Sequence, residues 1–344
     1  MEIESIHFYV RDFSQIGNLL IKKMGLQDSG GVNGMTSCYH LGNNLPYFAV
    51  SSPQDSSPCE DYLNLHPPGV QDIAFWVDNL DEIRQRVDRR RVKILEHRVI
   101  DKLPGLRIQG WGSIEHTIIQ SPMSSSSHED RSIAGSDLQN PITGIDHIVL
   151  NVPAGELDAA VDWYRDIFDF QVEQSFIINT DRSGLFSKAL ISACGKIRFN
   201  INEPSSSNSQ IQEFLDLNQG AGIQHIALHT DNIFQTVDRM QRQGLEFLPI
   251  PKTYYNNLKM RDLGRIESLL TSKELQALEH LQILADWSED TPESLLMQTF
   301  TKPIFEQPTF FFEIIQRRDR AQGFGAGNFQ ALFEAVEQHH EQMR

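Results

Sequence analysis

The chain has 344 residues, 40% of them hydrophobic, which is enough to build two packed domains. Its 30 basic and 46 acidic residues give a formal net charge of −16, so nucleic acid and anionic membranes are unfavourable partners. No apolar run is long enough to span a membrane, and the first residues lack the basic and apolar segments of a secretory signal. The three cysteines have no metal-binding spacing, so we expect reduced thiols and a cytoplasmic protein.

Two parts of the chain carry a similar pattern. The segment GVQDIAFWVDNLDEIRQRV at Gly69 resembles GIQHIALHTDNIFQTVDRM at Gly222, and each predicts a short strand, an Asp-Asn turn and a helix. In the same way HTIIQ resembles FEIIQ at Phe312, and SIHFYV near the N-terminus resembles IDHIVL at Ile145. The repeat predicts an α+β chain in which two similar sheets each curl around an internal cavity.

A segment between the two parts has the composition of a linker. Residues 123–143 are rich in Ser, Asp and Gly and contain few large apolar residues. We therefore predict an N-terminal domain over residues 1–122 and a C-terminal domain over residues 144–344.

The C-terminal part predicts further elements in chain order. The segment ELDAAVDWYRDIF has apolar residues at helical spacing, and NEPSSSNSQ, residues 202–210, predicts a surface loop. A helix then follows HIALHT and closes at Gly244, and another begins near Ser272. A last helix, residues 328–342, has one apolar face, so we expect it to cover another part of the molecule.

The segment PTFFFEIIQR places one carboxylate, Glu313, in a run that is typical of a strand covered on both faces. A buried carboxylate is costly unless it is paired or binds a metal. His147 and His225 each lie singly on the inward face of a predicted strand. Two imidazoles and one carboxylate leave one side of a metal ion open, and this set suits non-haem Fe(II) and oxygen chemistry. Structural zinc would require four ligands, often thiolates.

Spacing alone leaves other interpretations open. A lone His in a strand is usually a core or edge residue, and a lone Glu can pair with an Arg. In the first part, the corresponding positions are interpreted as His7, Asp72 and Thr117. Thr is a poor metal ligand, so we expect the first part to be structural.

The motifs GIQHIALHTDNI, MQTFTKP, PTFFFEIIQR and GFGAGNFQALFEAVE resemble the 4-hydroxyphenylpyruvate dioxygenase family of the vicinal-oxygen-chelate superfamily. The resemblance covers essentially the whole chain. It implies two tandem vicinal-oxygen-chelate domains of repeated βαβββ modules, each an open, barrel-like curved sheet. It also implies Fe(II) held by His147, His225 and Glu313, and conversion of 4-hydroxyphenylpyruvate and O2 to homogentisate and CO2, as in tyrosine catabolism.

The same resemblance assigns residues to the substrate pocket. Phe300 and Phe329 would hold the substrate ring between them, and Gln224 and Gln298 match glutamines near the iron that are expected, with Asn202, to be catalytic. The remaining expected substrate contacts are Ser187, Asn202, Gln210, Phe311, Phe324 and Asn328.

Two positions depart from the family pattern: Asn200 stands where Pro usually precedes INEP, and Phe186 changes the segment around Ser187. Both are expected close to the pocket. One alternative function is 4-hydroxymandelate synthase, which uses the same iron, oxygen and substrate; Phe300 and Asn202 favour the dioxygenase, whereas Asn200 favours the synthase. A second alternative is a non-catalytic protein that binds a small aromatic molecule without iron. We also expect a homo-oligomer, because most soluble oligomers are symmetric assemblies of identical chains.

Overall fold

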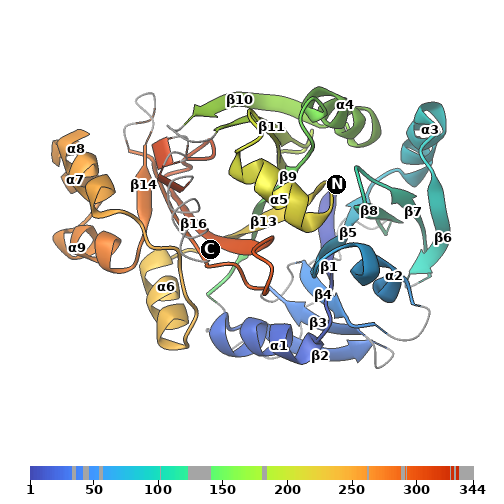
Figure 1. Ribbon diagram of the computed structural model, residues 1–344, viewed down its shortest axis with the longest axis horizontal. Helices are drawn as coiled ribbons and strands as arrows, with labels where there is room; N and C mark the ends of the chain where they lie inside the picture. The colour runs from blue at the N-terminus through green and yellow to red at the C-terminus, as the bar shows by residue number, and fades with distance from the viewer. Residues whose placement is uncertain are drawn as a thin grey trace.

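Two eight-stranded sheets form the framework of the protein, one from each half of the chain (Figure 1). The computed structural model describes residues 1–32, 36–41, 46–53, 57–100, 102–122, 141–179, 184–261, 263–287, 291, 293–325, 327–328 and 331–332. The predicted linker therefore lies outside the described residues except for 141–143. The same holds for the predicted last helix except for residues 328, 331 and 332.

The first sheet consists of β1 (Glu2–Tyr9), β2 (Gln27–Val32), β3 (Thr36–His40), β4 (Tyr47–Ser51), β5 (Gly69–Val77), β6 (Ile94–Ile100), β7 (Leu103–Gln109) and β8 (Glu115–Gln120). The helices of this half are α1 (Phe13–Asn18), the π-helix η1 (Leu19–Lys23), α2 (Pro58–Leu65) and α3 (Leu80–Arg90).

The second sheet consists of β9 (Gly144–Asn151), β10 (Gln171–Asn179), β11 (Gly184–Ile191), β12 (Arg198–Pro204), β13 (Gly222–His229), β14 (Leu284–Asp286), β15 (Leu295–Phe300) and β16 (Phe311–Arg318). The helices are α4 (Leu157–Phe168), α5 (Gln210–Asn218), α6 (Ile233–Arg242), α7 (Lys252–Arg261), α8 (Leu263–Leu269) and α9 (Ser272–His280).

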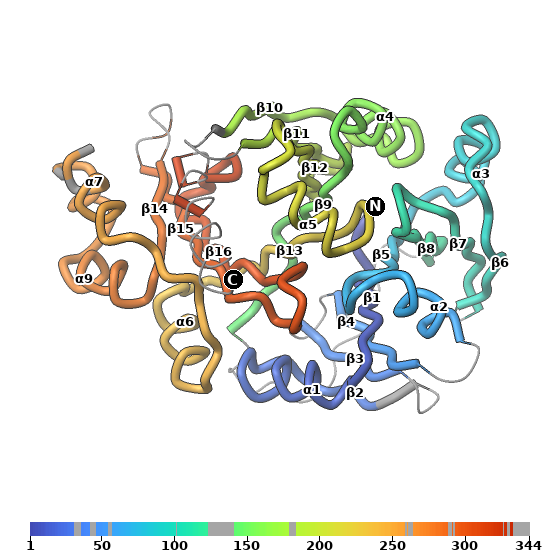
Figure 2. Tube along the Cα trace, in the orientation of Figure 1, coloured from blue at the N-terminus to red at the C-terminus, as the bar shows by residue number. Residues whose placement is uncertain are grey.

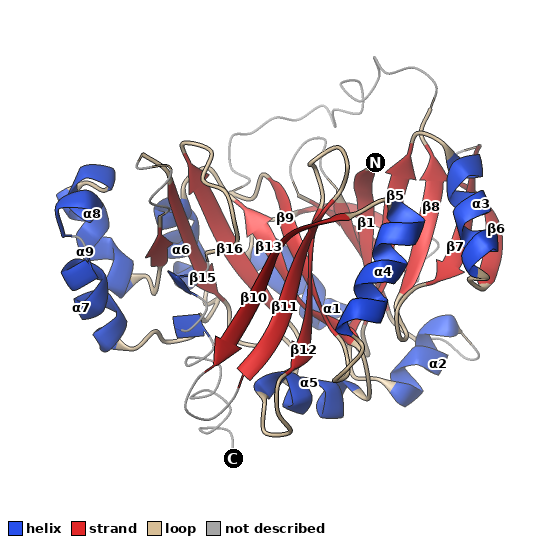
Figure 3. Cartoon of the chain, turned by 90° about the horizontal axis from the view of Figure 1, so that it is seen from above, coloured by secondary structure: helices blue, strands red, loops and turns tan. Residues whose placement is uncertain are grey.

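The strand orders confirm the predicted duplication and the α+β class. The first sheet runs β2-β3-β4-β1-β5-β8-β7-β6, and the second runs β10-β11-β12-β9-β13-β16-β15-β14. Adding eight to each strand number of the first order gives the second, so both halves have the same connectivity. Both sheets curve along their length (Figure 3).

Three predicted helices of the second half are confirmed, and two of them begin at a side-chain cap. Helix α4 buries the apolar stripe that the sequence shows. The side chain of Asn232 accepts a hydrogen bond from the Gln235 amide and caps α6, while Thr271 forms a capping box with Glu274 at the start of α9. Helices α7 and α9 lie beyond β14, at the outer end of this half (Figure 2).

The predicted loop over residues 202–210 was wrong at both ends. Asn202 to Pro204 still belong to β12, and Gln210 begins α5. The hydroxyl of Ser209 accepts a hydrogen bond from the Ile211 amide, so one of the serines in this segment caps a helix. The polar composition indicated a break in the chain but did not reveal how short it is.

The two halves share one continuous hydrophobic core. The rings of Phe8 and Phe48 in the first sheet contact Phe312 on β16 of the second, with ring centroids 6.3 and 5.6 Å apart. Because successive side chains of a strand point to opposite faces, this contact leaves the other face of β16, which carries Glu313, free to line a cavity. Among the described residues, none of the helices is both long and apolar enough to cross a membrane.

Candidate functional site

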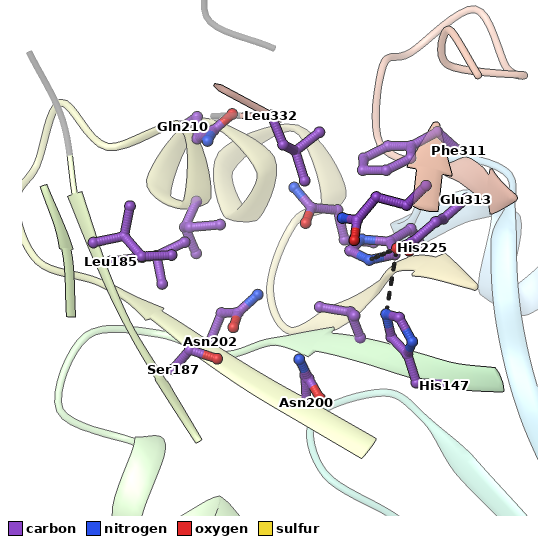
Figure 4. A pocket seen from close by; sticks show the side chains of 15 residues that line it. His147, Leu185, Ser187, Asn200, Asn202, Gln210, His225, Phe311, Glu313 and Leu332 are labelled. Atoms are coloured by element: carbon purple, nitrogen blue, oxygen red, sulfur yellow. Dashed lines mark ion pairs between the residues drawn. The ribbon is translucent and has the colours of Figure 1, made fainter. Parts of the chain in front are cut away.

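Strand register brings His147, His225 and Glu313 to one face of the second sheet. His147 on β9 and Glu313 on β16 both pair with Ala227 of β13, from opposite sides. His225 lies two residues before Ala227 on β13, and residues two apart share a face. The three side chains therefore come from adjacent strands β9, β13 and β16 and meet over the middle of the sheet (Figure 4).

The carboxylate of Glu313 lies between the two imidazoles. Its Oε2 is 3.3 Å from His147 Nε2 and 3.5 Å from His225 Nε2, and the potential ligand atoms all lie within 4.8 Å of one another. Two ligand atoms that are each about 2.1 Å from one ion at roughly right angles are about 3.0 Å apart. The donor set therefore fits one divalent cation after small side-chain adjustments.

A chain of hydrogen bonds holds His147 from behind. Its Nδ1 lies 2.9 Å from Asp146 Oδ1, and Arg317 donates from Nε and Nη2 to the two carboxylate oxygens of Asp146, both at 2.7 Å. Arg317 Nη1 also donates to the carbonyl oxygens of Ala321 and Gly323. The Asp146–Arg317 pair therefore orients the imidazole and ties the segment after β16 to the site.

The charges in the site compensate one another. Burial disfavours the charged form of His147, but Glu313 and Asp146 outweigh burial and raise the pKa of His147 to about 9. Burial acts in the same sense on Glu313, yet the two imidazoles hold the pKa of its carboxyl below the usual value. Burial lowers the pKa of His225. A cation bound at this point would replace the proton on His147 as the positive partner of Glu313.

Several buried polar atoms of the site have no hydrogen-bond partner among the described residues. They include Oε1 of Glu313, Nδ1 of His225 and Oε1 of Gln298. Buried polar groups are normally paired, so an unpaired oxygen of Glu313 beside two imidazoles indicates a site that is completed by a ligand.

The ligand set opens into a cavity; the space between atoms there, together with the open solvent at its mouth, is ≈ 590 Å³. The residues that line it are His147, Val149, Ile178, Leu185, Ser187, Asn200, Asn202, Gln210, Ile211, Gln224, His225, Gln298, Phe311, Glu313 and Leu332. The structure thus brings together the three predicted ligands, both predicted glutamines and four of the predicted substrate contacts: Ser187, Asn202, Gln210 and Phe311.

Gln224 and His225 both reach the cavity although they are neighbours on one strand. The pairing of β13 with β9 shifts between Ile223 and His225, which is the signature of a β-bulge. A bulge re-aims side chains and is frequent beside active sites. Simple alternation along the strand would have sent Gln224 to the other face.

Three predicted substrate contacts do not line the cavity. Phe300 pairs with Glu313 in the sheet, and its ring lies 6.4 Å from His225. The Phe324 ring lies 5.3 Å from His147, and the carboxamide oxygen of Asn328 accepts a hydrogen bond from the Tyr254 hydroxyl at 2.7 Å. Phe300 and Phe324 therefore pack against the ligand imidazoles, and Asn328 is held by Tyr254. Phe329 lies outside the described residues.

The apolar wall of the cavity was not predicted from the sequence. Val149 stands two residues after His147, and Leu185 stands two residues before Ser187, so strand alternation was the signal that could have identified them. Phe186 was expected near the pocket and is not part of it. Its side chain points to the opposite face of β11 and is 37% exposed.

The first sheet carries different residues at the three ligand positions. In both halves an Ile–Ile pair joins the two central strands (Ile6–Ile73 and Ile148–Ile226). Aligning these two pairs makes Ser5 the counterpart of His147, and Asp72 the counterpart of His225. Thr117 pairs with Ala74 as Glu313 pairs with Ala227, so Thr117 corresponds to Glu313. The interpretation of His7 as the counterpart of His147 was therefore wrong by two residues.

Comparisons with known proteins agree with this fold. The Glyoxalase/Bleomycin resistance protein/Dioxygenase superfamily matches residues 144–262, the segment that carries both histidines. The fold also resembles that of a solved triple mutant of 4-hydroxymandelate synthase from Streptomyces coelicolor, with a TM-score of 0.82, 24% identity and 98% of both chains covered. The architecture and the three-residue site thus define a protein of the vicinal-oxygen-chelate class.

Full-length relatives narrow the class. 4-Hydroxyphenylpyruvate dioxygenase from Dictyostelium discoideum is 32% identical and the match covers 98% of both chains. An uncharacterized protein from Synechocystis sp. is 38% identical over 98% of this chain and 97% of its own length. The chain belongs to the 4-hydroxyphenylpyruvate dioxygenase family.

Proposed function

We propose that the chain is an Fe(II)-dependent dioxygenase that converts 4-hydroxyphenylpyruvate and O2 to homogentisate and CO2. The observation that carries this proposal is the convergence of His147, His225 and Glu313 on one point of a cavity with apolar and polar walls, in a chain of this family. Three protein ligands leave positions on a metal ion open for a substrate, as the chemistry of a 2-oxo acid and O2 requires.

The residues present fit an iron ion. His147, His225 and Glu313 would hold it, and two neutral imidazoles with one carboxylate are a set that Fe(II) accepts. A bound Fe(II) would supply Lewis-acid and one-electron chemistry toward the 2-oxo acid and O2. The Asp146–Arg317 pair keeps His147 Nδ1 engaged, so that Nε2 faces the metal position.

Different walls of the cavity would bind different parts of the substrate. Val149, Leu185 and Ile211 form an apolar wall that would pack on the substrate ring and exclude water. Gln224 and Gln298 add carboxamides to the cavity lining, and Ser187, Asn202 and Gln210 lie farther from the three ligands (Figure 4). The side-chain amide of Asn202 donates to Asn151 Oδ1 at 3.2 Å, which fixes its orientation.

A product assay tests the proposal. The protein, freed of metal and then reloaded with Fe(II), is given 4-hydroxyphenylpyruvate while oxygen uptake is recorded and the products are separated by chromatography. We expect uptake only with Fe(II), and homogentisate as the main product. Dominant 4-hydroxymandelate would assign the chain to the synthase reaction instead, and substrate binding without oxygen uptake would favour the non-catalytic alternative.

Location and assembly are two further properties of the proposed enzyme. Cys38, Cys59 and Cys194 are free thiols, which supports a reducing, cytoplasmic location. We also propose a homo-oligomer, because closed symmetric assemblies are common among soluble enzymes. Sedimentation of the purified protein would test the second property.

A further inference from the structure

Asn200 stands between the metal ligands and the polar end of the cavity. The register of the second sheet places Asn200 of β12, Val149 of β9 and His225 of β13 in one row across three adjacent strands. The next row holds Asn202 and Ser187. Adjacent strands are about 4.8 Å apart, so Asn200 is separated from His225 by about 10 Å of sheet. A ring that extends from the metal position across Val149 therefore arrives at Asn200.

The carboxamide of Asn200 is buried and incompletely paired. The residue is 5% exposed and lines the cavity, and its Oδ1 has no hydrogen-bond donor within the described part of the chain. The side-chain NH2 group of the neighbouring Asn202 donates to Asn151 Oδ1. A buried carbonyl oxygen without a donor is rare in folded proteins and indicates a group that a ligand satisfies.

The chemistry of the substrate determines which of its groups can donate a hydrogen bond to Asn200 Oδ1. A 2-oxo acid carboxylate and keto oxygen only accept hydrogen bonds at neutral pH, and both would be attracted to a metal ion held by His147, His225 and Glu313. The ring hydroxyl is the one donor of 4-hydroxyphenylpyruvate. We propose that Asn200 is a specificity-determining residue whose Oδ1 accepts the hydrogen bond donated by this ring hydroxyl. This inference rests on the proposed function. The chain would then select hydroxylated over unhydroxylated aryl 2-oxo acids, because the latter leave Oδ1 unpaired.

The test compares two substrates that differ only in the hydroxyl group, 4-hydroxyphenylpyruvate and phenylpyruvate. Oxygen uptake gives kcat/KM for both in the Fe(II)-loaded protein and in the variants Asn200→Ala and Asn200→Asp. We expect Asn200→Ala to lower kcat/KM for the hydroxylated substrate by about tenfold, and to change it little for phenylpyruvate. Asn200→Asp keeps an acceptor oxygen in either protonation state and should restore most of the preference.

Phe186→Ala is the matched control, because Phe186 lies on the adjacent strand but points away from the cavity. It should leave the substrate preference unchanged. Equal losses for both substrates in Asn200→Ala, or an unchanged preference, would overturn the proposal. If Asn200→Ala does not fold, the nearly isosteric Asn200→Leu serves in its place.

A binding measurement separates this inference from the proposed function. Calorimetric titration with 4-hydroxyphenylacetate and phenylacetate compares the same hydroxyl without any turnover. If the unsubstituted protein consumes no oxygen, the proposed reaction fails. The calorimetric preference for the hydroxylated acid, and its loss in the Asn200 variant, then still decide the role of Asn200.

Discussion

The two sheets have the same strand order, but the buried carboxylate in each has different partners. In the first sheet, Asp72 accepts hydrogen bonds from the backbone amide and the hydroxyl of Thr117 at 2.8 and 2.7 Å. Burial raises the pKa of Asp72 to about 7. In the second sheet, Glu313 lies between two imidazoles, its pKa is lowered, and its Oε1 has no partner among the described residues.

This contrast indicates that the backbone supplies the geometry and the side chains define the chemistry. Both sheets bring three side chains of adjacent strands to one point. A hydroxyl partner stabilises the carboxylate of the first sheet only partly, so burial still favours a proton there. Two imidazoles stabilise the ionised carboxylate of the second sheet and add metal donors. Substitutions at matched positions of the two halves test this contrast, and they follow in order of decreasing effect.

Removing the carboxylate of Glu313 should show the difference between the two sheets most clearly. Glu313→Ala is expected to lose metal and to lower turnover by more than about a hundredfold, because two neutral imidazoles leave the cation uncompensated. Iron content per chain and oxygen uptake measure the effect. Thr117→Ala, the same change at the corresponding position of the first sheet, should retain both. Normal iron content in Glu313→Ala would refute the proposed ligand set.

The hydrogen-bonded partner of His147 should have a smaller effect. Asp146→Asn removes the charge that orients the imidazole, and we expect metal affinity to fall by about 10- to 100-fold. A titration with a fluorescent competing chelator measures this loss. Glu4 precedes Ser5 as Asp146 precedes His147, so Glu4→Gln is the matched control and should bind metal as tightly as the parent. Equal affinities in the two variants would show that Asp146 has no orienting role.

The close approach of Gly325 to Gln298 gives a third test. Gly325 has φ +71°, and a Cβ added there would clash with Gln298 Oε1 at the cavity wall. Gly325→Ala should therefore displace this carboxamide and lower kcat/KM by about tenfold or more, with iron content unchanged. Gly155 has a similar φ, +83°, but open space around it. Gly155→Ala thus controls for backbone strain and should keep its activity.

The smallest effect concerns stability and pH. The pKa of Asp72 is about 7 in the folded chain, whereas the ordinary value, which we take for the unfolded chain, is 3.8. The folded state thus binds this proton more tightly than the unfolded state does. The difference stabilises the folded chain below about pH 4, and this stabilisation is lost as the pH rises through 7. Asp72→Asn should be more stable than the parent by about 1–3 kcal/mol at pH 8, with the difference shrinking toward pH 4.

Urea denaturation at several pH values measures the difference. The activity of Asp72→Asn should match that of the parent, since Asp72 lies in the first sheet. A difference in stability that does not depend on pH would show that Asp72 does not titrate in this range.

Similarity between segments of the sequence predicted the duplication, and strand periodicity predicted His147, His225 and Glu313 as potential ligands, although spacing alone left other interpretations open. These features follow from patterns along single segments, which need no knowledge of neighbouring strands. The same reasoning mistook His7 for the counterpart of His147, because a shift of two residues keeps a side chain on the same face. Only hydrogen-bonded pairing in the folded sheet identifies Ser5 as the true counterpart.

The surroundings of the ligands, by contrast, depend on the folded arrangement of the strands. Asp146 and Arg317 are 171 residues apart in the chain and meet only because β9 and β16 flank β13. The bulge that turns Gln224 into the cavity depends on how β13 pairs with β9. Whether Phe300 and Phe324 line the pocket or pack against the imidazoles depends on contacts that form only in the folded chain. Local periodicity defines which way a side chain points, whereas register and packing define what it meets.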